Sequence, residues 1–194
     1  MYNGFDELDA IAPFEVLQMA ARQVADLRVD FVTLDGATEV VAQHGSRLQV
    51  SRTLDETANL ILVPGGGWVA RAKQGAWAEA QRGTIPDALA KLHQQGKLLA
   101  SVCTGAMLLA TAGLLRGRNA TTHHNALQEL SDSGAQLQNA RVVDDGDIIT
   151  SGGVTSGLDL TLWLTERFYG SSTAIAIEQN LEYERRGTVW KRHV

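Results

Sequence analysis

KLLASVCTGA, residues 97–106, is the stretch that decides the fold of this 194-residue chain. After Lys97 its first half is apolar, as in a buried parallel strand. Its second half changes to small residues, and helix formers continue to residue 115, with Gly113 interrupting near the end. Cys103 stands where the strand gives way to the helix. This is the layout of a nucleophile elbow, in which a sharp turn raises one side chain above the carboxyl edge of a sheet.

Strand patterns occur at four other places in the chain. They are apolar or alternating runs over residues 28–34, 60–63, 141–144 and 147–150. The second run, LILV, ends at the sequence PGGG of residues 64–67, as buried parallel strands often do. The last two runs flank Asp145-Gly146, a dipeptide that favours a hairpin turn.

Helical patterns alternate with these strands. A helix is expected over residues 154–169, and another runs to residue 182 from Ser171 or Ser172, either of which can serve as its N-cap. Residues 185–194 are expected to form a basic tail on the surface. The alternation predicts an α/β fold with a mostly parallel sheet, and we expect residues 1–194 to form one domain.

The amino-terminal end departs from this pattern. A doubly wound sheet usually opens with a central apolar strand, whereas Met1–Gly4 leads directly into residues 5–17, which have the composition of loop and helix. The first strand is therefore expected to be missing. We hypothesise that the natural reading frame begins several residues upstream, which the intact mass of the natural protein tests.

Composition and charge exclude several classes of protein. Hydrophobic residues make up 44% and charged residues 20% of the chain, which is typical of globular proteins. The net charge of -5 is opposite to the positive charge with which proteins bind nucleic acid or an anionic membrane, so neither partner is expected. Neither a signal peptide nor an apolar run of about 18 residues is recognisable, so a cytoplasmic location is expected. One cysteine excludes an internal disulfide and multi-cysteine zinc modules.

The single cysteine has two interpretations. Free cysteines are usually buried and inert. A helix amino terminus, however, favours an anion and lowers the pKa of a thiol from its ordinary value of about 8.5. The elbow context favours the second interpretation, so we predict that Cys103 is a nucleophile with a lowered pKa.

Several segments resemble the ThiJ/PfpI superfamily, a class I glutamine-amidotransferase-like group. Cys-Thr-Gly at 103–105, paired with the pattern LDxxxPxEVL at 8–17, most resembles the isonitrile hydratases. The likeness extends to the amino-terminal domain of regulators that carry an AraC-type DNA-binding region. In order along nearly the whole chain, the segments are FDELDAIAPFEVL (5–17), PGGG (64–67), SVCTGAMLLATAGLLRGRNATTH (101–123), SGGVTSGL (151–158) and LEYERRGTVW (181–190).

The resemblance implies a flavodoxin-like three-layer sandwich, with the sheet between helices, and a homodimer. It also implies roles for individual residues. Cys103 aligns with the family nucleophile, and Asp9 aligns with the carboxylate that approaches the cysteine sulfur in the hydratases. Thr104 stands where many peptidase-like relatives have histidine, which argues against a Cys-His protease. His123 matches a histidine found near the cysteine in several relatives.

The acidic candidates also have plainer interpretations. Asp9 could simply be an acid in the first turn of a helix that begins near Pro13. Beside a thiolate, a carboxyl group has a raised pKa, can stay protonated and can then donate a proton. Glu15 is the reserve candidate for this role, although a solvated or capping acid is its plainer interpretation.

The histidines predict no metal site. His123 and His124 are typical of a helix entry with one ring packed and one exposed, and His123 remains a site candidate because histidine titrates near neutral pH. The remaining three, His44, His93 and His193, lack the spacing of metal ligands.

Two glycine-rich segments are expected to border the site. The amides of Gly65 and Gly66 follow a buried strand. The N–H of Gly66 together with that of Thr104 would form an oxyanion hole, in which each donor stabilises the transition state by about 3 kcal/mol. Residues 151–153, ending in Gly153, would form another rim. Because both segments lack a Walker lysine and the GxGxxG pattern, no nucleotide cofactor is expected. Trp68 and Trp77 are expected to line the crevice or the core.

These features predict a cysteine-dependent hydratase or hydrolase of a small-molecule electrophile. The best guess is a lyase that hydrates an isonitrile to an N-substituted formamide without a cofactor. A redox or metabolite sensor with an oxidisable cysteine remains open. A non-catalytic ligand-binding module, a glyoxalase or deglycase, and an amidase also remain open.

Overall fold

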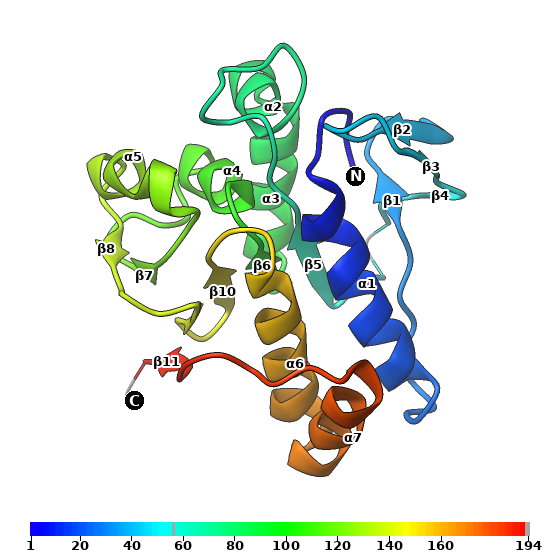
Figure 1. Cartoon of the computed structure of the whole chain (residues 1–194). Coiled ribbons are helices and arrows are strands. Elements are labelled where there is room, and N and C mark those ends of the chain that lie inside the picture. The colour runs from blue at the N-terminus through cyan, green and yellow to red at the C-terminus, as the bar shows by residue number, and fades with distance from the viewer. Residues whose placement is uncertain (56, 193–194) are drawn as a thin grey trace.

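The computed structural model describes residues 1–55 and 57–192. Its centre is a five-stranded sheet of order β11-β9-β10-β6-β5 (Figure 1). The neighbouring strands are parallel except for the antiparallel pair β9 and β10, so the mostly parallel sheet is confirmed. The strands are β5 (Leu60–Val63), β6 (Leu98–Ser101), β9 (Val142–Asp144), β10 (Ile148–Ser151) and β11 (Trp190–Lys191).

Three two-stranded pairs complete the β structure. Two pairs are parallel, and the pair of β2 and β3 is antiparallel. Their members are β1 (Val32–Thr33) with β4 (Arg52–Thr53), β2 (Glu39–Val41) with β3 (Arg47–Gln49), and β7 (Asn119–Ala120) with β8 (Gln136–Leu137).

Helices cover both faces of the central sheet (Figure 1). On one face α1 (Glu7–Ala21), α6 (Ser156–Tyr169) and α7 (Ser171–Leu181) pack against one another. On the other face α2 (Ala76–Arg82), α3 (Thr84–Gln94) and α4 (Gly105–Thr111) pack together, and a 3-10 turn (His124–Ala126) leads into α5 (Leu127–Asp132). The result is a flavodoxin-like α/β fold.

The sheet is built from runs that the sequence marks as buried on both faces. Every residue of β10 is buried, and Leu99, Ile148 and Ile149 are wholly enclosed by helices. The hairpin between β9 and β10 is confirmed, and Gly146 has a φ of 99°, which its turn requires and a side chain would disfavour.

The helix expected from Ser171 or Ser172 begins at Ser171, as predicted, but its N-cap is Gly170, with a φ of 91°, rather than a serine. The helix start expected near Pro13 is wrong, because Pro13 lies inside α1. The N-cap of α1 is Asp6, whose side chain accepts a hydrogen bond from the Leu8 N–H at 3.2 Å.

The expected tail does lie largely at the surface, but two parts of it are tied to the rest of the fold. Trp190–Lys191 forms β11, paired parallel with β9. Arg185 forms ion pairs with Glu166 and Glu178 of two helices. These contacts join residues far apart in the sequence, so local composition does not reveal them. Residues 193–194 lie outside the described residues.

At the amino terminus, no strand precedes α1 in the part of the chain that the structure describes. The amino group of Met1 donates a hydrogen bond to the carbonyl of Val32 in β1, and β5 is the last strand of the sheet on that side. Separately, none of the described helices is both long and apolar enough to cross a membrane.

Gly105 is expected to tolerate no side chain, because a Cβ there would lie 2.2 Å from the carbonyl oxygen of Val63 on β5. Gly105→Ala should therefore lower the free energy of unfolding by about 3 kcal/mol or more, as measured by urea denaturation. Gly157→Ala is the control, because its Cβ would meet only side chains, the Pro13 ring at 3.1 Å and Val102 at 3.4 Å, and should cost about 1 kcal/mol. Equal losses in the two variants would contradict this account.

Candidate active site

Cys103 lies in the turn between β6 and α4 in a strained backbone conformation. Its φ is 57°, a left-handed value that residues other than glycine rarely adopt. Two hydrogen bonds hold this conformation: the Cys103 N–H donates to the carbonyl of Gly152 at 2.9 Å, and the Thr122 hydroxyl donates to the carbonyl of Cys103 at 2.8 Å. The side chain is almost buried, with Cys103 6% exposed. The turn is thus fixed from both sides by neighbouring segments.

Glycines allow the loop after β5 to approach this turn closely. A Cβ on Gly65 would lie 2.5 Å from the backbone nitrogen of Thr104, and one on Gly105 would also meet backbone atoms. Residues 64–67 therefore lie directly against the Cys103 turn, as expected for segments that follow neighbouring parallel strands.

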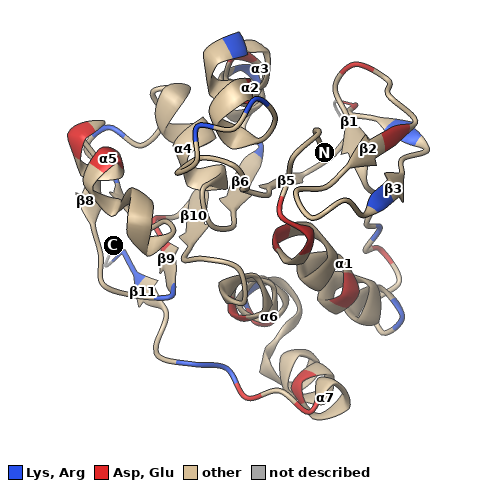
Figure 2. Cartoon of the chain, turned by 45° about the horizontal axis from the view of Figure 1, so that its top comes forward, with Lys and Arg blue, Asp and Glu red and all other residues tan. Residues whose placement is uncertain are grey.

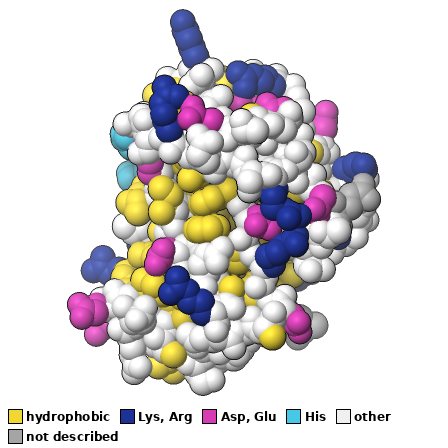
Figure 3. All heavy atoms as spheres, turned by 90° about the vertical axis from the view of Figure 1, so that its right-hand side faces the viewer, with side chains coloured by type: hydrophobic (Ala, Val, Ile, Leu, Met, Phe, Trp, Pro, Cys, Tyr) yellow, Lys and Arg dark blue, Asp and Glu magenta, His cyan; other side chains and the backbone are white. Residues whose placement is uncertain are grey.

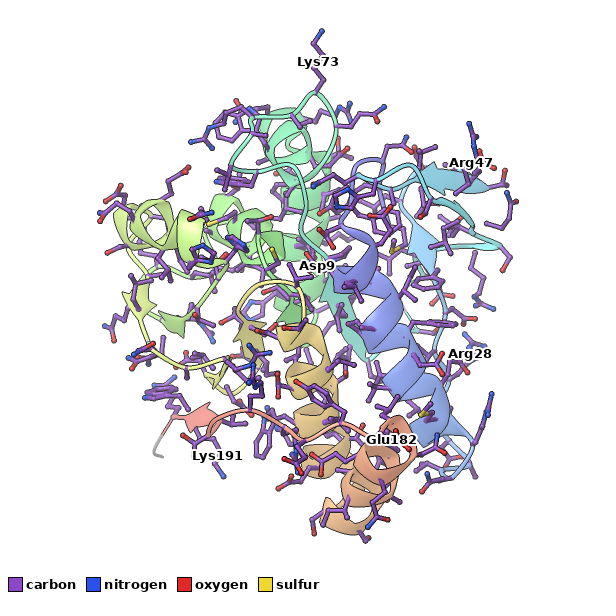
Figure 4. All side chains as sticks on the ribbon, viewed as in Figure 1. Asp9, Arg28, Arg47, Lys73, Glu182 and Lys191 are labelled. Atoms are coloured by element: carbon purple, nitrogen blue, oxygen red, sulfur yellow. The ribbon has the colours of Figure 1, made fainter. Side chains whose placement is uncertain are left out.

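Asp9 comes from the first turn of α1 and is fully buried. One carboxylate oxygen, Oδ2, accepts a hydrogen bond from the Gly65 N–H at 3.0 Å, while Oδ1 is buried without a partner among the described residues. Burial, followed by the charge of Asp6, raises the pKa of Asp9 to about 7. Figure 2 shows the acidic residues at the start of α1, and Figure 4 shows Asp9 at this end of the helix.

The lowered thiol pKa expected from the sequence is wrong for this conformation. Burial first, and the negative charge of Asp9 second, raise the pKa of Cys103 to about 12. Backbone N–H groups of Val154 and Thr104 oppose this rise, but they do not reverse it. A helix start at Gly105 is not enough to offset the loss of water around the sulfur.

Val154 is a site residue that sequence reasoning missed. Its backbone N–H lowers the pKa of both Cys103 and Asp9, so it lies next to the pair. Its φ is 48°, an unusual value for a β-branched residue. The preceding Ser151-Gly152-Gly153 was expected at the rim, but nothing in the sequence signals that the next residue turns its amide toward the sulfur.

Thr104 uses its side chain in a way that changes the expected oxyanion hole. Its hydroxyl accepts a hydrogen bond from the Gly66 N–H at 3.0 Å, so this amide already has a partner within the protein. The amides of Thr104 and Val154, rather than that of Gly66, face the sulfur. The Gly66 N–H therefore holds the Thr104 hydroxyl in place and does not face the sulfur.

His123 lies at the rim, packed on Gly153. A Cβ on Gly153 would fall 2.4 Å from the imidazole Cδ2. The ring lies 4.2 Å from that of His124, and its Nδ1 accepts a hydrogen bond from the Asn125 N–H at 3.2 Å. Burial and then His124 lower the pKa of His123, so the ring is neutral at pH 7. The expected helix entry, with His124 exposed, is confirmed.

The structure does not bring the remaining candidates to the sulfur. Glu15 is exposed on α1, in agreement with a solvated acid. Trp68 and Trp77 form an edge-to-face pair 5.2 Å apart within the main hydrophobic cluster, with Arg71 stacked on Trp77. Among residues 1–55 and 57–192, no three His, Cys, Asp or Glu side chains are grouped so that they could hold a metal ion.

The fold and this site define a class of protein. Residues 1–167 match the sequence profile of the DJ-1/PfpI family, and the chain belongs to this family. It is similar to a crystal structure of a ThiJ/PfpI family protein from Pseudomonas syringae, with a TM-score of 0.80 and 26% identity, over 96% of this chain and 74% of that one.

Among individual relatives, the chain is 34% identical to an isonitrile hydratase from Pseudomonas putida, over 94% of this chain and 76% of that protein. It is 32% identical to the HTH-type transcriptional regulator CdhR from Pseudomonas aeruginosa, over 91% of this chain but only 51% of the regulator. It is 27% identical to a deglycase from Pyrococcus horikoshii, over 84% of this chain and 92% of that protein.

Replacing Asp9 by asparagine should stabilise the protein in a pH-dependent way. With a pKa of about 7, against an ordinary value of 3.8, the folded carboxyl keeps a proton that the unfolded one releases. The stability of the parent protein therefore falls as pH rises from about 4 to about 7. Asp9→Asn should raise Tm by about 3 °C or more at pH 8 and by little at pH 3.5. Glu15→Gln, at an exposed acid, is the control, and an equal effect of Asp9→Asn at both pH values would contradict the raised pKa.

The alkylation rate of Cys103 should report its raised pKa directly, because the chain has one cysteine. With a pKa of about 12, the rate constant with iodoacetamide should increase up to pH 10 without a plateau. In Asp9→Asn the curve should move to lower pH, because the neighbouring negative charge is removed. A plateau below pH 8 in the parent protein would show a low-pKa thiolate instead.

Proposed function

We propose that this protein is a cysteine-dependent hydratase of a small electrophile, with an isonitrile as substrate. One observation carries the proposal: Cys103 and Asp9 lie buried together, with the amides of Thr104 and Val154 directed at the sulfur. The similarity to an isonitrile hydratase supports the choice of substrate. In this proposal the strained Cys103 turn between β6 and α4 serves as a nucleophile elbow.

In the first step the thiol of Cys103 adds to the terminal carbon of the isonitrile. Asp9 accepts the thiol proton and delivers it to the same carbon, while the carbon–sulfur bond forms. The product is a thioimidate, R–N=CH–S, attached to Cys103. A carboxyl group with a pKa of about 7 suits this shuttle, because both of its protonation states are populated near neutral pH.

In the second step water resolves the thioimidate. Water adds to the C=N carbon with Asp9 as the base, and the nitrogen takes up the proton. The carbon–sulfur bond then breaks, which releases the N-substituted formamide R–NH–CHO and returns the thiol of Cys103. Splitting one hydration into two easier steps is the advantage of a covalent nucleophile, and the shuttle needs no cofactor.

Burial favours a slender substrate over the alternatives. With Cys103 only 6% exposed, the linear isonitrile group suits the space around the sulfur better than a branched carbohydrate adduct. A thiol pKa of about 12 leaves little thiolate for peroxide near pH 7, which disfavours a redox sensor. The similarity to a regulator keeps a ligand-binding role as the second candidate.

The family resemblance also supports a homodimer. Leu8 and Ile11 are exposed on α1, at 47% and 42%, and such apolar side chains are suited to an interface. We include a dimer in the proposal and would test it by analytical ultracentrifugation.

Cys103→Ala should lower the turnover rate with a small alkyl isonitrile at least about a thousandfold, because the covalent step is lost. In the parent protein, rapid quenching and mass spectrometry should reveal Cys103 heavier by the mass of the isonitrile. Formamide release is followed by proton NMR.

Matched controls separate this proposal from its alternatives. Glu15→Gln should keep full activity, because Glu15 is exposed away from the sulfur. Full activity of Cys103→Ala would refute the covalent mechanism. Isonitrile binding without turnover or adduct in the parent protein would favour the ligand-binding role.

A further inference from the structure

Val154 has a backbone conformation that its own residue type does not favour. Its φ is 48°, and β-branched residues adopt such values rarely. A strained residue persists only where the surrounding structure fixes it from several directions. Because the N–H of Val154 faces Cys103 and Asp9, the contacts that fix residues 152–155 also fix part of the site.

Arg141 holds this segment at both ends. Its carbonyl oxygen accepts a hydrogen bond from the Gly152 N–H at 2.9 Å, and its guanidinium Nη2 donates to the Thr155 hydroxyl at 3.2 Å. Val154 lies between these two contacts. The Gly152 carbonyl in turn accepts from the Cys103 N–H at 2.9 Å, so the held segment is also tied to the Cys103 turn.

The guanidinium of Arg141 is itself fixed by Asp159, in the first turn of α6. Nε and Nη2 both donate to Asp159 Oδ2, at 2.8 and 2.6 Å. The carboxylate is 4% exposed, and it also accepts from the Tyr183 hydroxyl at 3.0 Å and from the Arg186 N–H at 2.8 Å. A buried carboxylate with this many partners makes its network rigid, so Arg141 has little freedom to move.

These contacts use properties that are specific to arginine. A guanidinium offers several N–H donors in one plane, so a single side chain can bond Asp159 and Thr155 together. A lysine ammonium is a point charge on a flexible stem, and it would not hold both partners in one geometry. Thr155 is the N-cap of α6, but within the described chain its hydroxyl makes no capping hydrogen bond to the helix. The hydroxyl therefore serves the contact with Arg141.

We propose that Arg141 is a positioning residue, which holds the N–H of Val154 against the sulfur of Cys103. Asp159 fixes the guanidinium, and the carbonyl and guanidinium of Arg141 fix residues 152–155. The consequence for catalysis rests on the proposed function, in which this amide stabilises the charge that develops on sulfur during attack.

A matched ion pair provides the control. Arg167 and Asp144 also join α6 to β9, at 2.9 Å, with side chains 28% and 8% exposed, against 30% and 4% for Arg141 and Asp159. Within the described residues, Arg167 bonds to the hairpin between β9 and β10 and not to the Val154 segment. Two strands separate β9 from β5, so Arg141→Lys also leaves unchanged the hydrophobic side chains that gather on the side of β1 and α1 (Figure 3).

The test follows the amide proton of Val154 by NMR as the pH is varied. Two titratable groups can move this signal: Asp9 of α1, with a pKa of about 7, and His123, whose ring packs on Gly153 and whose pKa is lowered by burial. The Cys103 thiol, with a pKa of about 12, keeps its proton over this range. The part of the shift that disappears in Asp9→Asn is therefore due to Asp9.

The Asp9 part of the shift should fall at least about twofold in Arg141→Lys, because a displaced N–H lies farther from the carboxylate. Thr155→Val keeps the ion pair with Asp159 and loses only the hydroxyl, so it should lower this part in the same direction. Arg167→Lys should leave it unchanged. With an isonitrile, kcat should fall at least about threefold in Arg141→Lys while KM changes less than about twofold, because the amide acts on charge formed during attack.

Two results would overturn the proposal. One is an Asp9 part of the shift that is equal in the parent protein, in Arg141→Lys and in Thr155→Val. The other is an equal loss in Arg167→Lys, which would show a general effect of weakening an ion pair. The NMR measurement needs no substrate. An absence of isonitrile turnover in the parent protein would therefore count against the proposed function alone, and the Val154 signal would still decide the role of Arg141.

Discussion

The burial of one carboxyl group beside one thiol is the constraint on which the rest of this structure depends. Asp9 is fully buried and Cys103 nearly so. The charge of Asp9 raises the pKa of Cys103, whereas the Cys103 thiol lowers the pKa of Asp9, which burial raises. Such a pair costs stability unless it is hydrogen-bonded or kept partly protonated. The protein does both: the Gly65 amide holds one carboxylate oxygen, and a pKa of about 7 keeps Asp9 partly protonated near neutral pH.

The proposed reaction follows from this balance rather than from a preformed thiolate. A thiol with a pKa of about 12 is a poor nucleophile by itself. Beside a carboxyl group with a pKa of about 7, it has a base within reach that can take its proton as the bond to carbon forms. The amides of Thr104 and Val154 oppose the rise in the thiol pKa and so favour the charge that develops on sulfur during attack.

The sequence predicted most of the strands of the central sheet because their signals are local. LILV at 60–63 and the hairpin at Asp145-Gly146 carry burial and turn signals within a few residues, and both are observed. β11 depends on pairing with β9, and Gly170 caps α7 in place of the expected serine, so neither could be deduced from short-range composition. In the site, motif resemblance pointed to Cys103 and Asp9. Val154 was missed because its contribution is a backbone N–H, turned by a positive φ that a valine does not suggest.

The amino-terminal segment connects β1 to the site of Asp9 and Cys103. From Met1, whose amino group is bonded to Val32 of β1, the chain passes Gly4, whose N–H donates to Val41, and then Asp6, whose N–H donates to the carbonyl of Gly65. A Cβ on Gly4 would lie 2.5 Å from the backbone of Gln74, so this path has little freedom to shift. Three residues after Asp6 comes Asp9, which accepts from the same Gly65. One short, tightly packed segment therefore holds Met1 against β1 and Asp9 against the loop that follows β5.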